Sequence, residues 1–423
     1  MAVIPGISGD DVQTGTANDD RILASGGFDT IDGLQGFDTI DYRAAPAGIS
    51  VVPTESFPPF FTSPDDALIF DGFGAFDHVI GGVEGILGSS FRDVIEGNTV
   101  DNLFFGFDGN DVLRGGSGND RLDGGRGNDT LDAGEGSDTL LGRSGADVLI
   151  GGEGGGDTML GGDGDDTLRA SGDDPVVMRG NAGNDAMFFA GALGNPEVFG
   201  GDGNDVAVIV NDAGGNLSGG HGDDDLSLFA DPARSFGAVQ GGPGDDTIRV
   251  ELEFGEISGG GGDDTISGVI DVGVFDGKSG NDVLTIVGGG WVPSLLGGEG
   301  DDVLINANEG FPVSLTLDGG RGNDVLRGGG AEDVFQFSLN DRGADVVENF
   351  VAGEDLLQFE DAGLQFDDFD TNDSASLEAG DEAVSSIGND LVIDVAAVAD
   401  VDFLNTVTVV DTLSVAETDT LFI

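Results

Sequence analysis

A nine-residue repeat dominates the middle of the chain and constrains its fold more than any other feature. From Gly106 the sequence reads GFDGNDVLR, GGSGNDRLD, GGRGNDTLD, AGEGSDTLL, GRSGADVLI, GGEGGGDTML and GGDGDDTLR, and one copy carries an inserted residue. The shared pattern is G-G-x-G-x-D-x-U-x, where U is apolar. About ten consecutive copies keep one frame, because looser copies at Gly88 and Gly97 precede these. So strict a period is typical of a solenoid, in which each repeat buries its apolar side against its neighbours.

Beyond Asp166 the motif continues at about double the interval, every 18 to 22 residues. Two nonapeptides make one coil with two turns, so we expect one side of the solenoid to keep its Asp-containing turns throughout. The frame assigns Asp93, Asp111, Asp129, Asp147 and Asp166 to the side of Asp185. On the opposite side we expect Asp120, Asp138 and Asp157, followed after Ser171 by ordinary loops such as residues 211–216 and 230–237.

The charge of the chain requires cations and excludes several partners. The 423 residues carry 81 acidic and 15 basic side chains, for a formal net charge of -66, which opposes compaction unless cations neutralise it. Nucleic acids and anionic membranes are bound through clustered Lys and Arg, so neither is an expected partner, and no apolar run is long enough to enter a membrane. Disorder is the alternative for an acidic chain, but the hydrophobic content of 38% and the 28 Phe residues argue against it.

The repeat supplies the chemistry that Ca2+ prefers. This hard cation takes oxygen ligands from carboxylates and backbone carbonyls. Position six places one carboxylate in each turn, and we expect Gly at positions one, two and four to reach positive φ and turn carbonyls inward. Position eight is apolar from Leu113 to Leu326, which predicts an inward-facing apolar ladder with Ala207 as its weakest member. The chain contains no Cys, so thiolate metal sites and disulfides are excluded.

These motifs are similar to the Ca2+-binding nonapeptides of RTX, or hemolysin-type, repeat proteins. The resemblance implies an all-β fold, a right-handed parallel β-roll with a C-terminal β-rich cap, in which two successive same-side turns share each ion. About a dozen Ca2+ ions would then bind, and the metal-free chain would be largely disordered. The predicted metal ligands are the position-six carboxylates Asp20, Asp38, Asp93, Asp111, Asp120, Asp129, Asp138, Asp147, Asp157, Asp166, Asp185, Asp205, Asp224, Asp246, Asp264, Asp282, Asp302, Asp324 and Asp333.

Three regions are expected: looser repeats and a strand-rich segment in residues 1–87, the calcium-binding roll in 88–337, and a cap in 338–423. The FPPFF cluster at residues 57–61 is expected to cover an edge of the solenoid rather than to act as a recognition loop. The acidic and then apolar residues 419–423 resemble the uncleaved C-terminal signal of type I secretion substrates. The resemblance therefore implies the type I secretion machinery as a partner, and an extracellular or cell-surface location in a Gram-negative bacterium.

The biological role stays open between two classes at this point. One is a structural surface or matrix protein that self-associates, and the other is an adhesin or carbohydrate-binding module that binds cell-surface glycans. An enzyme, such as one that modifies polysaccharides, is not expected, because no catalytic constellation stands out. His78 and His221 do not belong to the H-E-x-x-H motif of the serralysin proteases.

Overall fold

The computed structural model describes residues 1–53, 67–79, 81–231, 235–288, 293–308, 314–338, 342–352 and 354–360, and short segments between 376 and 422. Every regular element in these residues is a β-strand, and none is a helix that could cross a membrane. The FPPFF cluster at residues 57–61 lies outside the described residues. The chain divides into two compact units, Met1–Ala207 and Val208–Ile423, and strand β22 (Val206–Val210) contains the boundary.

The first unit is a parallel β-solenoid with two stacks of strands. Each strand pairs with its counterpart one coil later, as in the pairs Leu113↔Leu131 and Leu122↔Leu140. Stack A begins with β2 (Val12–Thr14), β4 (Thr30–Asp32) and β8 (Phe76–Val79). It resumes with β10 (Val94–Glu96), which stacks on β6 (Ser50–Pro53) rather than on β8, and continues through β12 (Val112–Ser117), β14 (Thr130–Glu135), β16 (Val148–Ile150), β18 (Thr167–Ser171) and β20 (Ala186–Ala190). Stack B consists of β1 (Ala2–Ile4), β3 (Asp20–Leu23), β5 (Thr39–Asp41), β9 (Gly85–Leu87), β11 (Leu103–Asp108), β13 (Arg121–Arg126), β15 (Thr139–Ser144), β17 (Thr158–Asp163), β19 (Val177–Ala182) and β21 (Glu197–Asp202).

One excursion interrupts this regular winding near the N-terminus. After β5 the chain leaves the coil to form β6 (Ser50–Pro53) and β7 (Ala67–Phe70), which pair antiparallel with each other, and β7 also pairs antiparallel with β8. The chain then returns, so that β9 lies directly on β5 and β10 lies on β6. The excursion thus lies between the N-terminal coils and the regular array.

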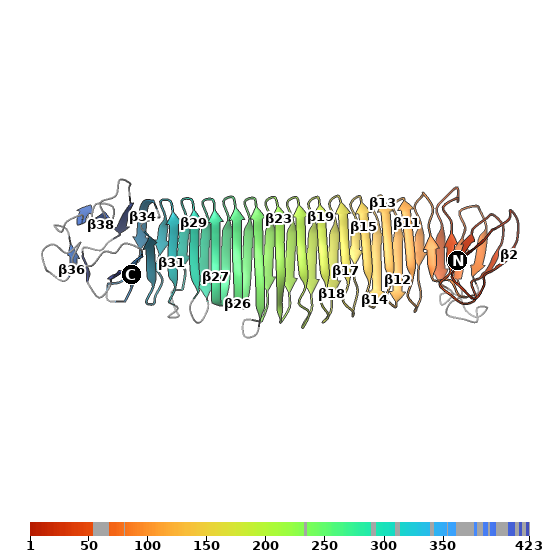
Figure 1. The fold of residues 1–423 in the computed structure, drawn as a ribbon, viewed down its shortest axis with the longest axis horizontal. Coiled ribbons are helices and arrows are strands. Elements are labelled where there is room, and N and C mark those ends of the chain that lie inside the picture. The colour runs from red at the N-terminus through yellow and green to blue at the C-terminus, as the bar shows by residue number, and fades with distance from the viewer. Residues whose placement is uncertain are drawn as a thin grey trace. The chain divides into compact units, whose positions relative to one another are not determined.

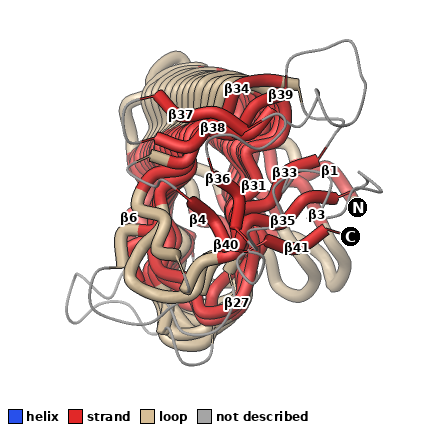
Figure 2. The backbone as a smooth tube through the Cα atoms, turned by 90° about the vertical axis from the view of Figure 1, so that its left-hand side faces the viewer, coloured by secondary structure: helices blue, strands red, loops and turns tan. Residues whose placement is uncertain are grey.

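The second unit contains two stacks of the same two kinds. Stack A contains β24 (Asp225–Phe229), β28 (Val283–Gly288), β30 (Val303–Asn306), β32 (Val325–Arg327) and β34 (Gly343–Glu348). Stack B contains β23 (Gly214–His221), β25 (Phe236–Pro243), β29 (Ser294–Glu299), β31 (Thr316–Arg321), β33 (Val334–Ser338) and β35 (Leu356–Glu360). The long strands β26 (Thr247–Gly261) and β27 (Thr265–Ser279) take part in both stacks, because their two halves pair in different stacks. Figure 1 shows the strands of successive coils side by side within each unit, and Figure 2 shows that strands, drawn in red, alternate with loops around a coil.

The cores of both units are built from the residues that the repeat places inward. In the first unit Leu113, Leu131 and Leu149 have no exposed surface, and in the second unit Leu284 and Leu304 are equally buried. Ala207 is also buried. The outward neighbours of these residues remain partly exposed, which is the period-two alternation of a β-strand. The prediction of an all-β parallel solenoid with an apolar ladder at position eight is thus confirmed.

The C-terminal segments add strands to the last coil. Strand β39 (Asn405–Val409) pairs parallel with β34, and β38 (Asp390–Asp394) and β37 (Val384–Ile387) follow in antiparallel pairing. Strand β41 (Thr420–Phe422) pairs parallel with β35, and β36 (Ser376–Glu378) pairs antiparallel with β40 (Ser414–Ala416). Strands from these segments therefore pair with the two strands of the final coil.

Candidate metal centre

The position-six carboxylates form hydrogen-bonded ladders along the coils. In the first unit the backbone N–H of Asp111 donates to Oδ1 of Asp129 at 2.7 Å, one coil later, and the N–H of Asp129 donates to Oδ1 of Asp147 at 2.7 Å. The same bond joins Asp246 to Asp264 at 2.8 Å in the second unit. We name these carboxylates ladder A. Its members in the first unit are Asp93, Asp111, Asp129, Asp147, Asp166, Asp185 and Asp205, and in the second unit they are Asp224, Asp246, Asp264, Asp282, Asp302, Asp324 and Asp345.

The other carboxylate oxygen of most of these residues is buried without a hydrogen-bond partner. Asp264 is 1% exposed; its Oδ1 accepts the backbone bond, whereas its Oδ2 has neither solvent nor a donor. Among the described residues the same holds for Oδ2 of Asp38, Asp111, Asp120, Asp129, Asp138, Asp147, Asp157, Asp166, Asp185, Asp246, Asp282 and Asp302. A buried charged oxygen without a partner is strongly destabilising. A repeated row of such atoms therefore indicates where a positively charged ligand could bind.

Glycine at position one forms the wall of a small cradle beside this oxygen. A Cβ at Gly106 would lie within 3 Å of two oxygens, Oδ2 of Asp111 and the backbone carbonyl oxygen of Gly124 one coil later. The same pair of oxygens surrounds Gly142, Gly161, Gly180, Gly241, Gly277 and Gly297. A carboxylate from one coil and a carbonyl from the next thus converge on one point in each turn. Sharing of a ligand between successive coils is compatible with this arrangement.

The structure corrects the role expected for the first glycine of the motif. Position two has positive φ, as at Gly125 with φ 105°, and so does position four, as at Gly127 with φ 119°. Gly124 at position one does not have positive φ. This position excludes a side chain because of space: a Cβ there would meet the Asp129 carboxylate. Position two tolerates other residues at positive φ, as at Arg143, because its side chain points away from the cradle.

Burial shifts the proton affinity of the ladder strongly. Desolvation raises the pKa of Asp111 to about 8, and it raises the pKa of Asp264 and Asp302 to about 7. The backbone hydrogen bond to each carboxylate acts in the opposite direction but is outweighed, and neighbouring carboxylates raise the pKa further. A cation in the cradle would stabilise the ionised form and reverse this shift.

The opposite side of the roll carries a second, interrupted row, ladder B. In the first unit the N–H of Asn102 donates to Oδ1 of Asp120. The N–H of Asp120 then donates to Oδ1 of Asp138 at 2.7 Å, and the N–H of Asp138 donates to Oδ1 of Asp157 at 3.0 Å. The next position is the buried Val176, so the row lapses where the sequence predicted it. In the second unit a pair resumes, in which the N–H of Asp333 donates to Oδ1 of Asp355.

Three predicted ligands differ from the others because their Oδ2 atoms accept a backbone N–H from their own turn. In Asp93 both carboxylate oxygens accept backbone N–H groups, Oδ1 from Ile49 and Oδ2 from Ser89. Asp20 and Asp333 are likewise bonded through both oxygens. In all three turns the N–H of the second residue occupies Oδ2. We therefore leave Asp20, Asp93 and Asp333 out of the proposed ion sites.

Other ladder members escaped the repeat pattern. A similar row lies beside stack A near the N-terminus. It consists of Asp11, Asp29 and Asp77, since Asp11 N–H donates to Asp29 and Asp29 N–H donates to Asp77. Asp38 belongs to ladder B, and Glu84 follows it there because it accepts the Asp38 N–H. Asp345 follows Asp324 in ladder A, and Asp355 follows Asp333 in ladder B. Asp29, in SGGFDTID, could have been found from its 18-residue distance to Asp11. The sequence gives no signal for Glu84, which follows no nonapeptide.

The comparison with protein families identifies the repeat. The model for the RTX calcium-binding nonapeptide repeat matches residues 5–41, 87–122, 114–149, 123–156, 240–271 and 316–337. The chain carries RTX calcium-binding repeats. These RTX repeats include turns of both ladders, among them those that end in Asp120, Asp129 and Asp264. No curated protein matches the chain.

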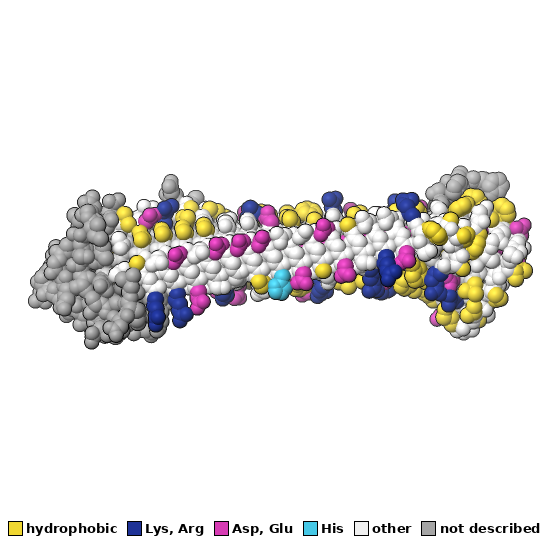
Figure 3. Space-filling view, turned by 90° about the horizontal axis from the view of Figure 1, so that it is seen from above, with side chains coloured by type: hydrophobic (Ala, Val, Ile, Leu, Met, Phe, Trp, Pro, Cys, Tyr) yellow, Lys and Arg dark blue, Asp and Glu magenta, His cyan; other side chains and the backbone are white. Residues whose placement is uncertain are grey.

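The residues present fit the cation that binds to RTX repeats. Ca2+ prefers carboxylate and carbonyl oxygens, and each cradle presents one of each: the buried, unpartnered Oδ2 of its Asp and a backbone carbonyl oxygen from the next coil. Within the described residues no group of three or more His, Cys, Asp or Glu side chains surrounds a common point. Backbone carbonyls would therefore supply much of the coordination. On the face that Figure 3 shows, backbone and side chains that are neither hydrophobic nor charged cover much of the surface, and separate acidic side chains lie among them.

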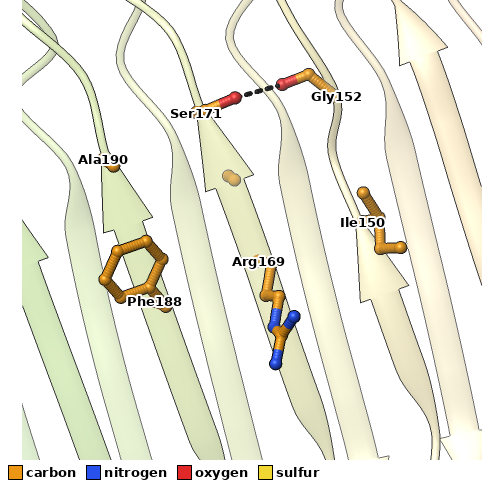
Figure 4. A pocket seen from close by; sticks show the side chains of 7 residues that line it. Ile150, Gly152, Arg169, Ser171, Phe188 and Ala190 are labelled. Atoms are coloured by element: carbon orange, nitrogen blue, oxygen red, sulfur yellow. Dashed lines mark hydrogen bonds between the residues drawn. The ribbon is translucent and has the colours of Figure 1, made fainter.

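A hollow on the outer face of stack A has a different character. Its volume is about 520 Å3, and it lies beside Ile150, Arg169 and Phe188, which are neighbours on adjacent strands (Figure 4). Ser171 Oγ donates to the carbonyl of Gly152 at its upper end. The hollow is apart from the cradles and contains no carboxylate.

Proposed function

We propose that this protein is an extracellular calcium-binding RTX protein whose β-roll forms when Ca2+ binds. The single observation that supports this best is the row of buried, unpartnered Asp Oδ2 atoms repeated coil after coil. Without cations, burial penalises the ionised form of these carboxylates and the neighbouring carboxylates add to the penalty, as the raised pKa values of Asp111 and Asp166 indicate. With cations the same atoms become ligands that link adjacent coils. Ion binding and folding are then one equilibrium.

Export through a type I secretion system completes this proposal. RTX repeat proteins are typically secreted by Gram-negative bacteria. The resemblance of residues 419–423 to a C-terminal secretion signal supports the same route. Free Ca2+ is scarce in the cytosol and abundant outside, so the chain would be exported unfolded and would fold in the medium. Deleting residues 419–423 should abolish export and leave Ca2+ binding intact, and undiminished export would contradict the assignment.

We also propose a structural or matrix role, in which the protein binds ions rather than catalyses a reaction. Most of the buried carboxylates belong to the ladders, where they would hold Ca2+. The test is to count bound Ca2+ by equilibrium dialysis and to follow the mass by sedimentation velocity. About a dozen ions per chain are expected. Growth in mass as Ca2+ is added would support self-association, whereas a strictly monomeric protein in excess Ca2+ would contradict it.

One observation favours the second candidate, a ligand-binding surface. Phe236 is 66% exposed and stacks on Phe254 with ring centroids 4.9 Å apart, and Val272 is next in register on the following strand. Exposed aromatic rings in a row can stack on the apolar faces of sugars. A glycan array probed with the Ca2+-loaded protein tests this candidate, and loss of a signal in Phe236→Ala would localise it.

A further inference from the structure

Asp38 and Asn102 both belong to ladder B, but the excursion separates them in the sequence. Strand β5 pairs in register with β9, as in Thr39↔Gly85, although the excursion through β6, β7 and β8 separates the two strands in sequence. A turn therefore has to be completed here by residues that do not belong to the same run of repeats. The family match stops at residue 41 and resumes at 87, so the returning residues lie outside it.

The returning residues rebuild the geometry of a ladder turn. The N–H of Asp38 donates to Glu84 Oε2 at 2.9 Å, which is the bond that each ladder Asp makes to the next Asp. Asp38 is fully buried, and its Oδ2 has no hydrogen-bond partner. A Cβ at Gly33 would lie within 3 Å of Asp38 Oδ2 and of the carbonyl oxygen of Gly82. These two oxygens correspond to those of the cradle at Gly106, where Asp111 provides Oδ2 and Gly124 provides the carbonyl.

The presence of Glu84, where a regular turn has Asp, has a simple steric basis. A regular repeat places its Asp five residues after the first glycine, whereas Glu84 comes two residues after Gly82. The extra methylene of Glu lengthens the side chain in a turn that is shorter than a nonapeptide turn. The charged groups that act on Asp38 are the carboxylates of Glu84, Asp20 and Asp19. The local field is therefore negative, which favours a cation.

We propose that Gly33, Asp38, Gly82 and Glu84 form a further Ca2+ site, which fastens the returning chain to the N-terminal coils. This inference rests on the proposed function, because it assigns to this turn the ligand of the RTX cradles. Glu84 and Gly82 are 46 and 44 residues after Asp38 in the chain, so an ion here joins the two sides of the excursion. Closure of so long a loop makes the stacking of β9 on β5 dependent on Ca2+.

Hydrogen exchange during a Ca2+ titration of the full chain tests the site. Residues 33–42 and 81–88 report on it, and residues 259–266, which belong to a regular repeat, report on the roll. The variant Glu84→Gln retains an acceptor for the Asp38 N–H but removes the charge. The control Glu96→Gln makes the same charge change at a partly exposed side chain that forms an ion pair with Arg114 on the surface.

We expect Glu84→Gln to raise the Ca2+ concentration for half-protection of residues 33–42 by about tenfold. The protection of residues 259–266 should not change, and Glu96→Gln should change neither segment. Equal midpoints in Glu84→Gln and the wild type would overturn the inference. A loss of protection that saturating Ca2+ cannot restore would also overturn it, since Glu84 would then serve packing alone. If residues 259–266 of the wild type do not respond to Ca2+, the proposed function itself fails.

Discussion

Replacing one ladder carboxylate should remove one ion from the folding equilibrium. Asp264 accepts the N–H of Asp246 through Oδ1 at 2.8 Å, and its Oδ2 faces the cradle beside Gly259 without a partner. In Asp264→Asn the amide oxygen can keep the backbone bond, while the charged oxygen that faces the ion is lost. The fold should therefore survive with one cradle disabled.

The size of the effect follows from linkage. For each ion that binds only the folded state, a tenfold rise in free Ca2+ adds about 1.4 kcal/mol to the free energy of unfolding, once the site is mostly occupied. Asp264→Asn should lower this dependence by about 1.4 kcal/mol per tenfold change, because one Oδ2 faces one cradle. Urea unfolding followed by circular dichroism at several buffered Ca2+ concentrations measures it.

Asp263→Asn is the matched control for this experiment. It makes the same charge change one residue earlier, at an exposed side chain whose Oδ1 accepts the N–H of Asn281. The next repeat has Asn at this position, Asn281, so the substitution is compatible with the turn. Its Ca2+ dependence should equal that of the wild type. If Asp264→Asn and Asp263→Asn changed the dependence equally, ladder Oδ2 atoms would not be the ligands, and the reasoning would be refuted.

Further outcomes follow from the same geometry. Gly262→Ala should destabilise the roll, because Gly262 has φ 124° and a Cβ would meet the Gly244 carbonyl. Gly261→Ala, at the open third position of the same repeat, should be tolerated. Thermal unfolding in Ca2+ compares the two variants. Leu284→Ala should lower the free energy of unfolding by about 2 to 5 kcal/mol, and Val283→Ala, a partly exposed neighbour, by much less. Burial raises the pKa values of Asp129, Asp264 and Asp111 from 3.8 to about 6, 7 and 8, respectively. Any metal-free roll should thus be most stable in acid and lose stability as the pH rises through that range, whereas calorimetry should show Ca2+ binding weakening as the pH falls through it.

The sequence predicted the architecture well because the repeat encodes it twice. The apolar residue at position eight defines the inward face, and the Asp at position six marks the turn, so Leu284 and Asp282 were both placed correctly. The two-sided arrangement also followed from spacing: Asp185 lies in the ladder of Asp166, and the row of Asp157 lapses as predicted.

What the sequence could not give depends on contacts between coils. The steric role of the first glycine appears only when Gly124 is seen beside the Asp129 carboxylate. The closed turn of Asp93 depends on an N–H from Ser89, and a motif count treats it like any other copy. Glu84 stands next to Asp38 only because the excursion returns the chain to that coil. Long-range closure of this kind has no local signature.

The central claim is that Ca2+ creates the β-roll, and far-UV circular dichroism during a Ca2+ titration of the chelated protein tests it most directly. The account predicts a largely disordered spectrum in chelator and a cooperative rise of β-signal as Ca2+ is added, with Mg2+ unable to replace it at equal concentration, since Mg2+ demands a stricter octahedral geometry. A spectrum already rich in β-structure after exhaustive chelation, and unchanged by Ca2+, would contradict it.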